Sequence, residues 1–598
     1  MTQGKRDTVP RHLIVSADER SWKFDRPVLF LGEWCRRYDR RSVWHNLDAI
    51  VAEPYGLDSL QKERDLARTK ALAANLLVDL ANMLNEFHGT RHSVRYWQIL
   101  IGHWLIRASG VVINRWATVE LALEDYVVSG VTLPDASNLS LATTDALAFI
   151  SATNDDEWNQ IVYAKIFALR SRGDIPIEFA RWGDRAFHPA PAVRPYRARL
   201  YAGAAQAAGW LLRVGSRSHD ALIINSYLPR TVAMKLELSL GQIPQSRVTP
   251  PLQTVKPDPL IRTKLMSHFQ TDGSALDRSL KTMVIEMIPA TYLEGYNLLL
   301  AQAKALGWPK TPKFIFTSNS FDHNEIFKAW AAEKVSDGVP YFIGQHGNNY
   351  GTTASDMDEW VCVAMSDKFV TWGWADGNPK HAPAFIFKTA EKRIPKRNPR
   401  GGLVLIHDNI PYRWDPWDVD ATFNATIHER FRFVETLPRE LQRQAIIRLH
   451  GNHASLRGFE KMRWEDRRYD VAVDDGVVPL RKLIKKSRLV VHAYDSTGIL
   501  ESLAQNTPML CFWLNPLEHL RPSARPYYQL LIDAGLLFGS GEEAAAKTAE
   551  IWDRVSEWWA SEQVQSARLR FCERYARHVD DPVSVLKKHL LQPLTHSQ

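Results

Sequence analysis

One stretch decides the fold: Val490-Val491-His492-Ala493-Tyr494-Asp495-Ser496-Thr497-Gly498-Ile499-Leu500-Glu501. Its first residues are apolar and typical of a strand, and residues 499–505 are typical of a helix. A strand that ends in a small polar cluster and leads into a helix places hydroxyls and unpaired backbone N–H groups at the helix N-terminus. Phosphate binds such a terminus because the helix dipole is positive there. A plain helix cap is the alternative, since Ser and Thr cap helices of any function.

The same rhythm of strand and helix recurs along the chain. It indicates parallel sheets that are covered on both faces, an α/β fold. Residues 96–116 are interpreted as a buried helix and strand, with an interfacial membrane patch as the alternative. The predicted strands lie at residues 13–15, 28–31, 221–224, 313–317, 339–343, 368–372, 402–406, 445–450, 471–473, 488–492 and 508–513, and the predicted helices at 58–88, 229–238, 323–335, 421–442, 478–486 and 541–579.

A chain of 598 residues is too long for one core, so several domains are expected. The basic, Pro-containing residues 388–400 lack apolar periodicity and are typical of a linker. We therefore predict an N-terminal, acceptor-side α/β domain over residues 1–390, with a helical insertion at about 117–220. A Rossmann-like domain that binds a nucleotide sugar would span 391–545, and helices over 546–598 would pack back on the first domain. Two such domains with a cleft between them form the GT-B-like architecture. Ligands are expected in that cleft, because open parallel sheets bind them at the carboxyl ends of their strands.

Composition excludes several classes of protein. The net charge of +8 is mild and both signs are interspersed, so no nucleic-acid partner is expected, while anionic substrates or a lipid surface stay open. The four cysteines are far apart, which argues against structural zinc or a disulfide framework. No apolar run reaches the roughly 18 residues that span a bilayer, and the N-terminus lacks a signal-peptide core. A cytoplasmic protein is expected, with peripheral association at the inner membrane left open.

Several catalytic signatures are missing. There is no GxxxxGK[ST], HExxH or GxSxG motif and no glycine-rich dinucleotide fingerprint, which disfavours P-loop enzymes, metalloproteases, α/β-hydrolases and hydride transfer. Two DxD triplets occur, at Asp356-Met357-Asp358 and Asp418-Val419-Asp420. Neither directly follows a clear strand, so both are interpreted as solvated loop acids. The sequence therefore predicts no metal site and no cofactor.

The loop Gly344-Gln345-His346-Gly347-Asn348-Asn349-Tyr350-Gly351 follows a predicted strand. Its glycines allow a tight turn and a close approach to a ligand. His346 is a candidate general base near neutral pH or, when charged, a candidate hydrogen-bond donor to a phosphate. A loop histidine that only bonds backbone is the alternative.

Further candidates follow other strands. Arg448 and His450 lie on one side of an extended chain and suit a phosphate contact, with an exposed strand end as the alternative. Glu501 is a candidate for ribose hydroxyls or for support of the helix N-terminus, and Asp474-Asp475 is a weaker ribose candidate. Asp18 and Glu33 follow the first two strands. Either carboxylate is a candidate base for an acceptor hydroxyl, although a solvated loop acid is the ordinary case.

Three of these elements resemble GT-B transferases that use cytidine-activated donors: Asp495-Ser496-Thr497 with Glu501, Gln345-His346-Gly347, and Arg448-Leu449-His450. CDP-glycerol glycerophosphotransferases have a His-Gly loop similar to residues 346–347 and an Asp-Tyr-Ser-Ser turn similar to residues 494–497. Bacterial sialyl- and Kdo-transferases carry a His-Pro pair and a Ser-Ser or Ser-Thr pair. His450 and Ser496-Thr497 are similar to these, with Gly451 in place of the proline.

Nearly the whole chain resembles a family of surface-carbohydrate transferases. The resemblance rests on LGEWC (31–35), RYW (95–97), SNSF and NE (318–325), GQHG and YG (344–351), TWGW (371–374) and DST (495–497). It implies a role in the assembly of lipopolysaccharide O-antigen, capsule or flagellin sugars, with a glycan or lipid-linked glycan as acceptor.

The resulting hypothesis is a metal-independent glycosyltransferase whose donor substrate is a nucleotide sugar, cytidine-linked by the resemblance. The donor would bind Arg448, His450, Asp495, Ser496, Thr497 and Glu501. His346 or Glu33 would accept the proton, and Gln345, Gly347 and Asp18 would lie in acceptor-side loops. Two alternatives remain: a CDP-alcohol phosphotransferase of the same fold, and a non-catalytic carbohydrate-binding protein.

Overall fold

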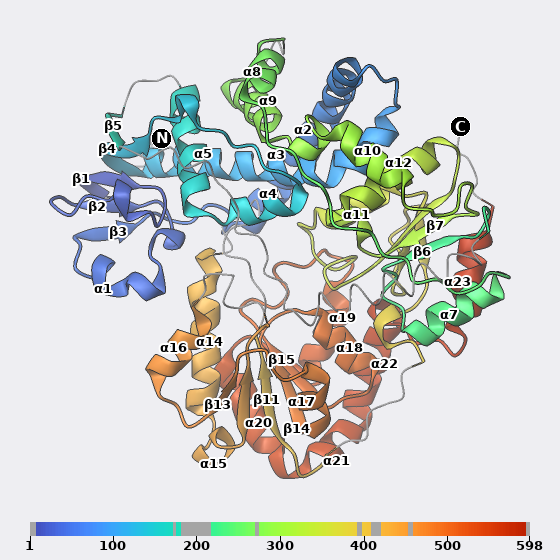
Figure 1. The fold of residues 1–598 in the computed structure, drawn as a ribbon. Coiled ribbons are helices and arrows are strands. Elements are labelled where there is room, and N and C mark those ends of the chain that lie inside the picture. The colour runs from blue at the N-terminus through green and yellow to red at the C-terminus, as the bar shows by residue number, and fades with distance from the viewer. Residues whose placement is uncertain are drawn as a thin grey trace.

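The computed structural model describes residues 7–170, 175–180, 217–268, 274–391, 398–407, 420–451 and 459–593. Its strands form three sheets, and within each sheet every pair of neighbouring strands is parallel. Figure 1 shows helices packed around each sheet. The predicted α/β fold class is confirmed.

The first sheet has the order β3-β2-β1-β4-β5. The predicted helical insertion at about 117–220 needs a correction, because the strands β4 and β5 also lie within that range. The sequence of β4, Tyr-Val-Val-Ser-Gly-Val-Thr-Leu-Pro, is typical of a strand. It follows a long helix without a break, so the start of the strand is not visible in the sequence. Residues 171–174 and 181–216 of the range lie outside the described residues. The strands are β1 (Asp7–Ile14), β2 (Val28–Phe30), β3 (Ala49–Val51), β4 (Tyr126–Pro134) and β5 (Ile177–Ala180).

Two long helices pack against each other, and the second of them leads into β4 of the first sheet (Figure 1). They are α2 (Ser59–His88), as predicted, and α3 (Val94–Asp125). Helix α3 spans all of residues 96–116, so the strand predicted there is wrong. The prediction that this segment is buried is confirmed. Most of α3 is buried because α2, α9 (Ala275–Met287), α12 (Glu325–Ser336) and α13 (Asp358–Met365) pack around it. No helix in the described parts of the chain is both long and apolar enough to cross a membrane.

The second sheet has the order β10-β9-β8-β7-β6. Its strands are β6 (Leu222–Ile224), β7 (Ile315–Thr317), β8 (Tyr341–Gly344), β9 (Lys368–Thr371) and β10 (His381–Pro383). The strands of residues 7–391 therefore divide between two sheets, which the sequence pattern did not separate. Between these strands lie α7 (Arg230–Ser239), α8 (Pro259–His268), α10 (Tyr296–Lys304) and α11 (Ser320–His323), with α4 (Ala146–Thr153) and α5 (Asp156–Arg170) earlier in the chain.

The third sheet has the order β13-β12-β11-β14-β15-β16. Its central strands are continuous apolar runs, as buried parallel strands require, and Leu489 and Val491 are fully buried. The strands are β11 (Gly402–Ile406), β12 (Ala445–Arg448), β13 (Ala472–Asp474), β14 (Ser487–His492), β15 (Met509–Phe512) and β16 (Leu537–Phe538). The helices are α14 (Asp420–Thr436), α15 (Arg439–Gln442), α16 (Glu460–Arg467), α17 (Leu480–Lys486), α18 (Thr497–Ala504), α19 (Arg525–Asp533) and α20 (Gly541–Ile551).

The chain then returns to the second sheet through α21 (Val555–Ala560), α22 (Glu562–Tyr575) and α23 (Pro582–Leu591). The backbone of Arg577, after α22, donates to the carbonyl of Trp372 at 3.0 Å and accepts from the amide of Ile386 at 3.0 Å. His589 Nε2 of α23 lies 3.1 Å from the carbonyl oxygen of Pro383. The last helices thus contact residues after β9 and β10, while the predicted boundaries near residues 390 and 545 stay predictions.

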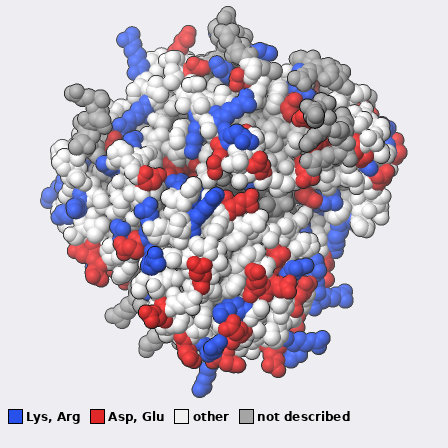
Figure 2. Space-filling view, turned by 180° about the vertical axis from the view of Figure 1, so that it is seen from behind, with Lys and Arg blue, Asp and Glu red and all other residues white. Residues whose placement is uncertain are grey.

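The surface carries both signs of charge. Figure 2 shows basic and acidic side chains interspersed over one face of the molecule. The four cysteines are buried and free. The absence of a nucleic-acid partner stays a prediction.

A buried carboxyl on α7 gives the fold a pH dependence. Burial raises the pKa of Glu237 to about 7, above its ordinary value of 4.5. Because the folded state holds this proton more tightly, the stabilisation is complete below the unfolded pKa and is lost as pH rises through about 7. Glu237→Gln should therefore melt at a higher temperature than wild type at pH 8, and the difference should shrink towards pH 5. The exposed Glu542→Gln is the control, and parallel pH profiles of wild type and Glu237→Gln would contradict the assignment.

Candidate functional site

The predicted histidine loop and the predicted phosphate turn lie against each other. The loop leaves β8 at the carboxyl end of the second sheet, and the turn leaves β14 at the carboxyl end of the third. The amide of Asn348 donates to Thr497 Oγ1 at 3.0 Å, and Asn348 Nδ2 donates to Asp495 Oδ1 at 2.6 Å. A Cβ placed on Gly347 would lie 3.2 Å from Thr497 Oγ1, so the loop approaches the turn closely at this glycine. Two motifs from different sheets thus form one site.

The start of α18 keeps an unused hydroxyl. Ser496 is the N-cap residue, yet its side chain makes no capping hydrogen bond. Ser496 Oγ is buried and lacks a hydrogen-bond partner among the described residues, as does Asn348 Oδ1. A buried polar atom without a partner is costly, which makes both atoms candidates for ligand contact. The alternative that the Ser496 side chain only caps the helix is therefore excluded. The neighbouring hydroxyl, Thr497 Oγ1, already accepts a hydrogen bond from the histidine loop.

Asp495 has a different role from the predicted donor contact. Its carboxylate accepts from Asn348, from His519 Nε2 at 3.0 Å and from the Tyr528 hydroxyl at 3.0 Å. Three protein donors therefore hold the carboxylate. Its negative charge is unsuited to a phosphate, and the structure assigns it to fixing the turn.

His346 lies in an aromatic surround at the site. Its Nδ1 is 3.1 Å from the Tyr350 hydroxyl, and its ring stacks on Tyr227 with centroids 6.0 Å apart. Phe321 lies at the same centroid distance. Burial lowers the pKa of His346 below its ordinary value, against the opposing effect of Asp358 and Asp322. The imidazole is therefore neutral at pH 7 and able to accept a proton.

A charge network lies close to His346, built on α3 and on the helices α11 and α13. His103 Nδ1 is 2.9 Å from Asp322 Oδ1, and His103 Nε2 is 3.0 Å from Asp358 Oδ1. Arg107 donates to Asp322 Oδ1 at 2.6 Å. The interpretation of Asp356 and Asp358 as solvated loop acids is wrong, because Asp358 joins this network and Asp356 accepts from the amide of Asp358 at 2.8 Å. The second triplet is not placed, since Asp418 lies outside the described residues and the Asp420 side chain is not described.

The charges in this network have clear physical causes. Burial opposes a charge on His103, and Arg107 adds to that, but Asp322 and Asp358 outweigh both and the pKa of His103 is raised. Arg107 and His103 likewise overcome burial at Asp358 and lower its pKa. Burial, then Asp358 and Glu359, raise the pKa of Asp356. The network is thus a protonated histidine and an arginine held between two carboxylates.

Gln345 builds the loop from within. Its side chain is buried, accepts from the Trp372 amide at 2.9 Å and from Trp374 Nε1 at 2.8 Å, and donates to the Gly347 carbonyl at 2.8 Å. At Gly351, φ is +73° and an added Cβ would lie 2.3 Å from the Trp374 ring, so only glycine fits. The TWGW element therefore supports the loop, and Gln345 has a structural role.

Arg448 and His450, which follow or end a strand of the third sheet, were predicted to contact the phosphate of the donor. Arg448 Nη1 forms an ion pair with Asp474 Oδ2, so the charge of each side chain is already matched by the other. His450 follows β12 and lies two residues before residue 452, where the described part of the chain is interrupted. Glu501 lies in α18, and its Oε1 is 3.5 Å from Lys388 Nζ.

Asp18 and Glu33 belong to the first sheet, not to the sheet that carries His346. Asp18 caps a short 3₁₀ helix, Glu19–Ser21, and binds Arg20. Glu33 opens another, Glu33–Cys35, and accepts from Arg36 Nε at 3.1 Å. That second helix packs near α14 of the third sheet. Arg20 and Arg36 are thus ion-pair partners of these two carboxylates, and a role of Asp18 or Glu33 towards the acceptor stays a prediction.

Two residues at the site were missed by sequence analysis. Tyr227 follows β6 with φ of +60°, which is uncommon for a bulky side chain and marks a constrained loop. Lys388 Nζ lies 4.9 Å from the centre of the Tyr227 ring. The sequence assigns Lys388 to the start of the linker, because the residues that follow it are basic and lack apolar periodicity. No feature of the sequence around Tyr227 indicates a site.

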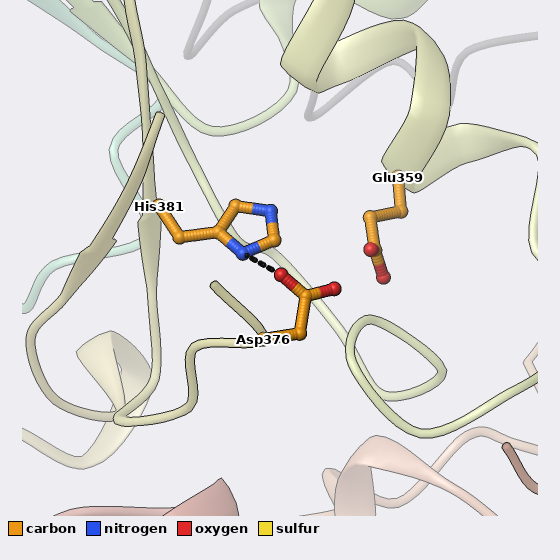
Figure 3. A group of neighbouring side chains, drawn as sticks. All are labelled: Glu359, Asp376 and His381. Carbon is orange, nitrogen blue, oxygen red and sulfur yellow. Dashed lines mark ion pairs between the residues drawn. The ribbon is translucent and has the colours of Figure 1, made fainter. Parts of the chain in front are cut away.

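One group of three side chains in the described part of the chain has the spacing of metal ligands: Glu359, Asp376 and His381 (Figure 3). His381 Nδ1 lies 2.8 Å from Asp376 Oδ1. The Arg521 guanidinium already contacts the group, at 2.9 Å from Glu359 Oε2 and 3.5 Å from Asp376 Oδ2. A guanidinium between both carboxylates supplies the charge that a metal would bring, so we assign the group a structural role.

Arg521 also joins the second and third sheets. Its amide donates to the Thr352 carbonyl at 2.8 Å, and Thr353 forms an antiparallel bridge with Leu520. The amide of Ala354 donates to the His519 carbonyl at 3.0 Å. Residues 519–521 thus hold the far end of the histidine loop, and the turn at Asp495 holds its middle.

Comparison with protein families gives one decisive match. The model of the LIC12162 family transferase matches residues 11–590. The chain belongs to this transferase family. The match includes the histidine loop, the phosphate turn and all three sheets. The prediction of a transferase is therefore confirmed, whereas no curated protein matches the chain.

Solved structures show only remote similarity to this family member. The spinosyn rhamnosyltransferase SpnG in complex with spinosyn aglycone is 14% identical, covering 50% of this chain and 77% of that chain, with a TM-score of 0.27. S. aureus MnaA with UDP is 14% identical over 63% and 96%, with a TM-score of 0.35. Acinetobacter baumannii MurG is 9% identical over 62% and 99%, with a TM-score of 0.28. Similarity this low assigns no activity.

Proposed function

We propose that this transferase is a metal-independent glycosyltransferase that uses a nucleotide-activated, cytidine-linked sugar. Its acceptor would be a glycan or lipid-linked glycan in the assembly of surface polysaccharide, O-antigen or flagellin sugars. A cytoplasmic location with peripheral association at the inner membrane belongs to the same proposal. One observation carries it: the histidine loop of one parallel sheet contacts the Asp495-Ser496-Thr497 turn of another.

The turn supplies the donor side of the site. The first-turn amides of α18 are suited to the phosphate of the nucleotide, because the helix dipole favours negative charge there. The Ser496 hydroxyl, which has no partner in the described parts of the chain, is suited to the same phosphate. Charge grows on that phosphate as the sugar departs. Donors that are already oriented stabilise this charge more in the transition state than in the ground state.

The histidine loop supplies the acceptor side. An acceptor hydroxyl oxygen attacks the anomeric carbon, and the bond between that carbon and the phosphate oxygen breaks with its electron pair leaving on the phosphate. His346 accepts the hydroxyl proton. Its lowered pKa keeps the imidazole neutral for this step. Contact between the two loops limits the access of water to the sugar.

A nucleotide panel tests the proposal. CMP, CDP, UDP and GDP are added separately while the melting temperature is measured. A cytidine nucleotide at one hundred times its Kd should add about 2.7 kcal/mol to the free energy of unfolding. Stabilisation by no nucleotide would overturn the proposal and favour a non-catalytic protein.

Analysis of the product separates two reactions of the same fold. A glycosidic bond in the product supports attack at carbon. A new phosphodiester would instead show attack at phosphorus, the reaction of a CDP-alcohol phosphotransferase, and would overturn the glycosyl assignment.

A further inference from the structure

The phosphate turn needs a cation, and the predicted one is committed elsewhere. A departing nucleotide carries negative charge that helix amides alone offset only in part. Arg448 is ion-paired with Asp474, both with largely buried side chains. A cation that reaches α18 at Glu501 is Lys388, which comes from the short helix η7 (Phe387–Thr389) at the end of the second sheet.

Lys388 occupies the junction between the two halves of the site. Its Nζ lies 3.5 Å from Glu501 Oε1, and Glu501 sits four residues after the first residue of α18. The same ammonium lies 4.9 Å from the centre of the Tyr227 ring, which stacks on His346. Lys388 also contributes to the lowered pKa of His346 through its charge. One lysine therefore contacts both the helix of the phosphate turn and the surround of the base.

We propose that Lys388 binds the phosphate of the donor nucleotide beside Ser496 and exchanges its partner Glu501 for that phosphate. This inference rests on the proposed function and names a binding residue for it. Two further observations point to a ligand at the same place: the buried hydroxyl of Ser496 and the buried Asn348 Oδ1 both lack a partner within the described residues.

The exchange is favourable for physical reasons. The Lys388 and Glu501 side chains are each partly exposed, so water screens their ion pair and breaking it costs little. As the sugar departs, the phosphate gains a second negative charge, so it then carries more charge than a carboxylate and offers more oxygens to an ammonium. The Tyr227 ring holds the ammonium in place through a cation–π contact. Phosphate binding by Lys388 would then bring the leaving group close to the neutral His346.

Lys388→Met tests the binding step. Titration calorimetry with CMP and with cytidine separates the phosphate from the nucleoside. Loss of the ammonium should weaken CMP binding by about 10-fold or more and leave cytidine within about two-fold. Lys388→Arg should restore most of the CMP affinity. Lys235→Met is the control. Lys235 lies in α7, where it forms an exposed ion pair with Glu391, so this variant should bind both probes as wild type does. Melting temperatures of all variants confirm that they fold.

Glu501→Gln tests the exchange with an effect of opposite sign. Removal of the carboxylate charge releases Lys388, so CMP should bind more tightly than to wild type while cytidine is unchanged. Weaker binding of both CMP and cytidine to Glu501→Gln would assign Glu501 to the ribose and overturn the exchange.

The outcomes separate this inference from the proposed function. Unchanged CMP affinity in Lys388→Met, or equal losses for CMP and cytidine, would overturn the role of Lys388 while the transferase assignment stands. Failure of wild type to bind any nucleotide of the panel would overturn both.

Discussion

His346→Ala is expected to lower turnover by about 10²–10⁴-fold, the range typical of a lost general base. Nucleotide affinity should stay within about two-fold of wild type, because the phosphate contacts come from the turn and from Lys388. Single-turnover transfer and CMP titration measure the two quantities separately. His578→Ala is the control, since this histidine is exposed and lies after α22. A loss of nucleotide binding with normal turnover at saturation would remove His346 as the base.

The same role predicts a pH profile. A base must be unprotonated to act, and burial lowers the pKa of His346 below its ordinary 6.5. The acid limb of the wild-type rate should therefore lie below pH 6.5, so activity persists as the solution becomes mildly acidic. An acid limb above pH 6.5 would contradict the assignment.

His103→Leu is expected to reduce the free energy of unfolding by about 1.5–3 kcal/mol, because the buried His103 ring makes charge-assisted contacts with the partly buried Asp322 and Asp358. Urea denaturation measures the change. His323→Leu is the matched control: His323 lies 3.4 Å from the same Asp322, but its side chain is 47% exposed and its removal should cost less than about 1 kcal/mol.

The sign of the pH dependence offers a second check. The pKa of His103 is raised above its ordinary 6.5, so its stabilisation is complete below that value and is lost as pH rises through the higher folded value. The stability difference between wild type and His103→Leu should therefore narrow at alkaline pH. A constant difference across that range would show that packing, not charge, explains the loss.

The sequence predicted most strands of the second and third sheets, because they are short apolar runs flanked by clear helices. It also predicted which two loops would meet, since the carboxyl ends of parallel strands collect ligand-binding loops. The first sheet was less visible. Its strand β4 starts where the 32-residue helix α3 ends, and β5 exposes most of its side chains, so neither stands out from its neighbours.

The chemistry of single side chains was harder to predict than the loops that carry them. Arg448 looked available for phosphate, but its partner Asp474 lies on the neighbouring strand β13. Asp358 looked solvated, but its partner His103 is 255 residues away in the sequence. Lys388 and Tyr227 gave no local signal. Each assignment depends on a tertiary contact that spacing along the chain does not encode.

The return of α22 and α23 to the second sheet has a practical consequence for studies of this enzyme. Cutting the polypeptide between the second and third sheets would not yield two autonomous modules, because the earlier fragment would lose the helices that cover Trp372 and Pro383. During translation, this region is complete only after the last helices have left the ribosome. Truncation close to the C-terminus should therefore be as harmful to solubility as a substitution deep in the interior.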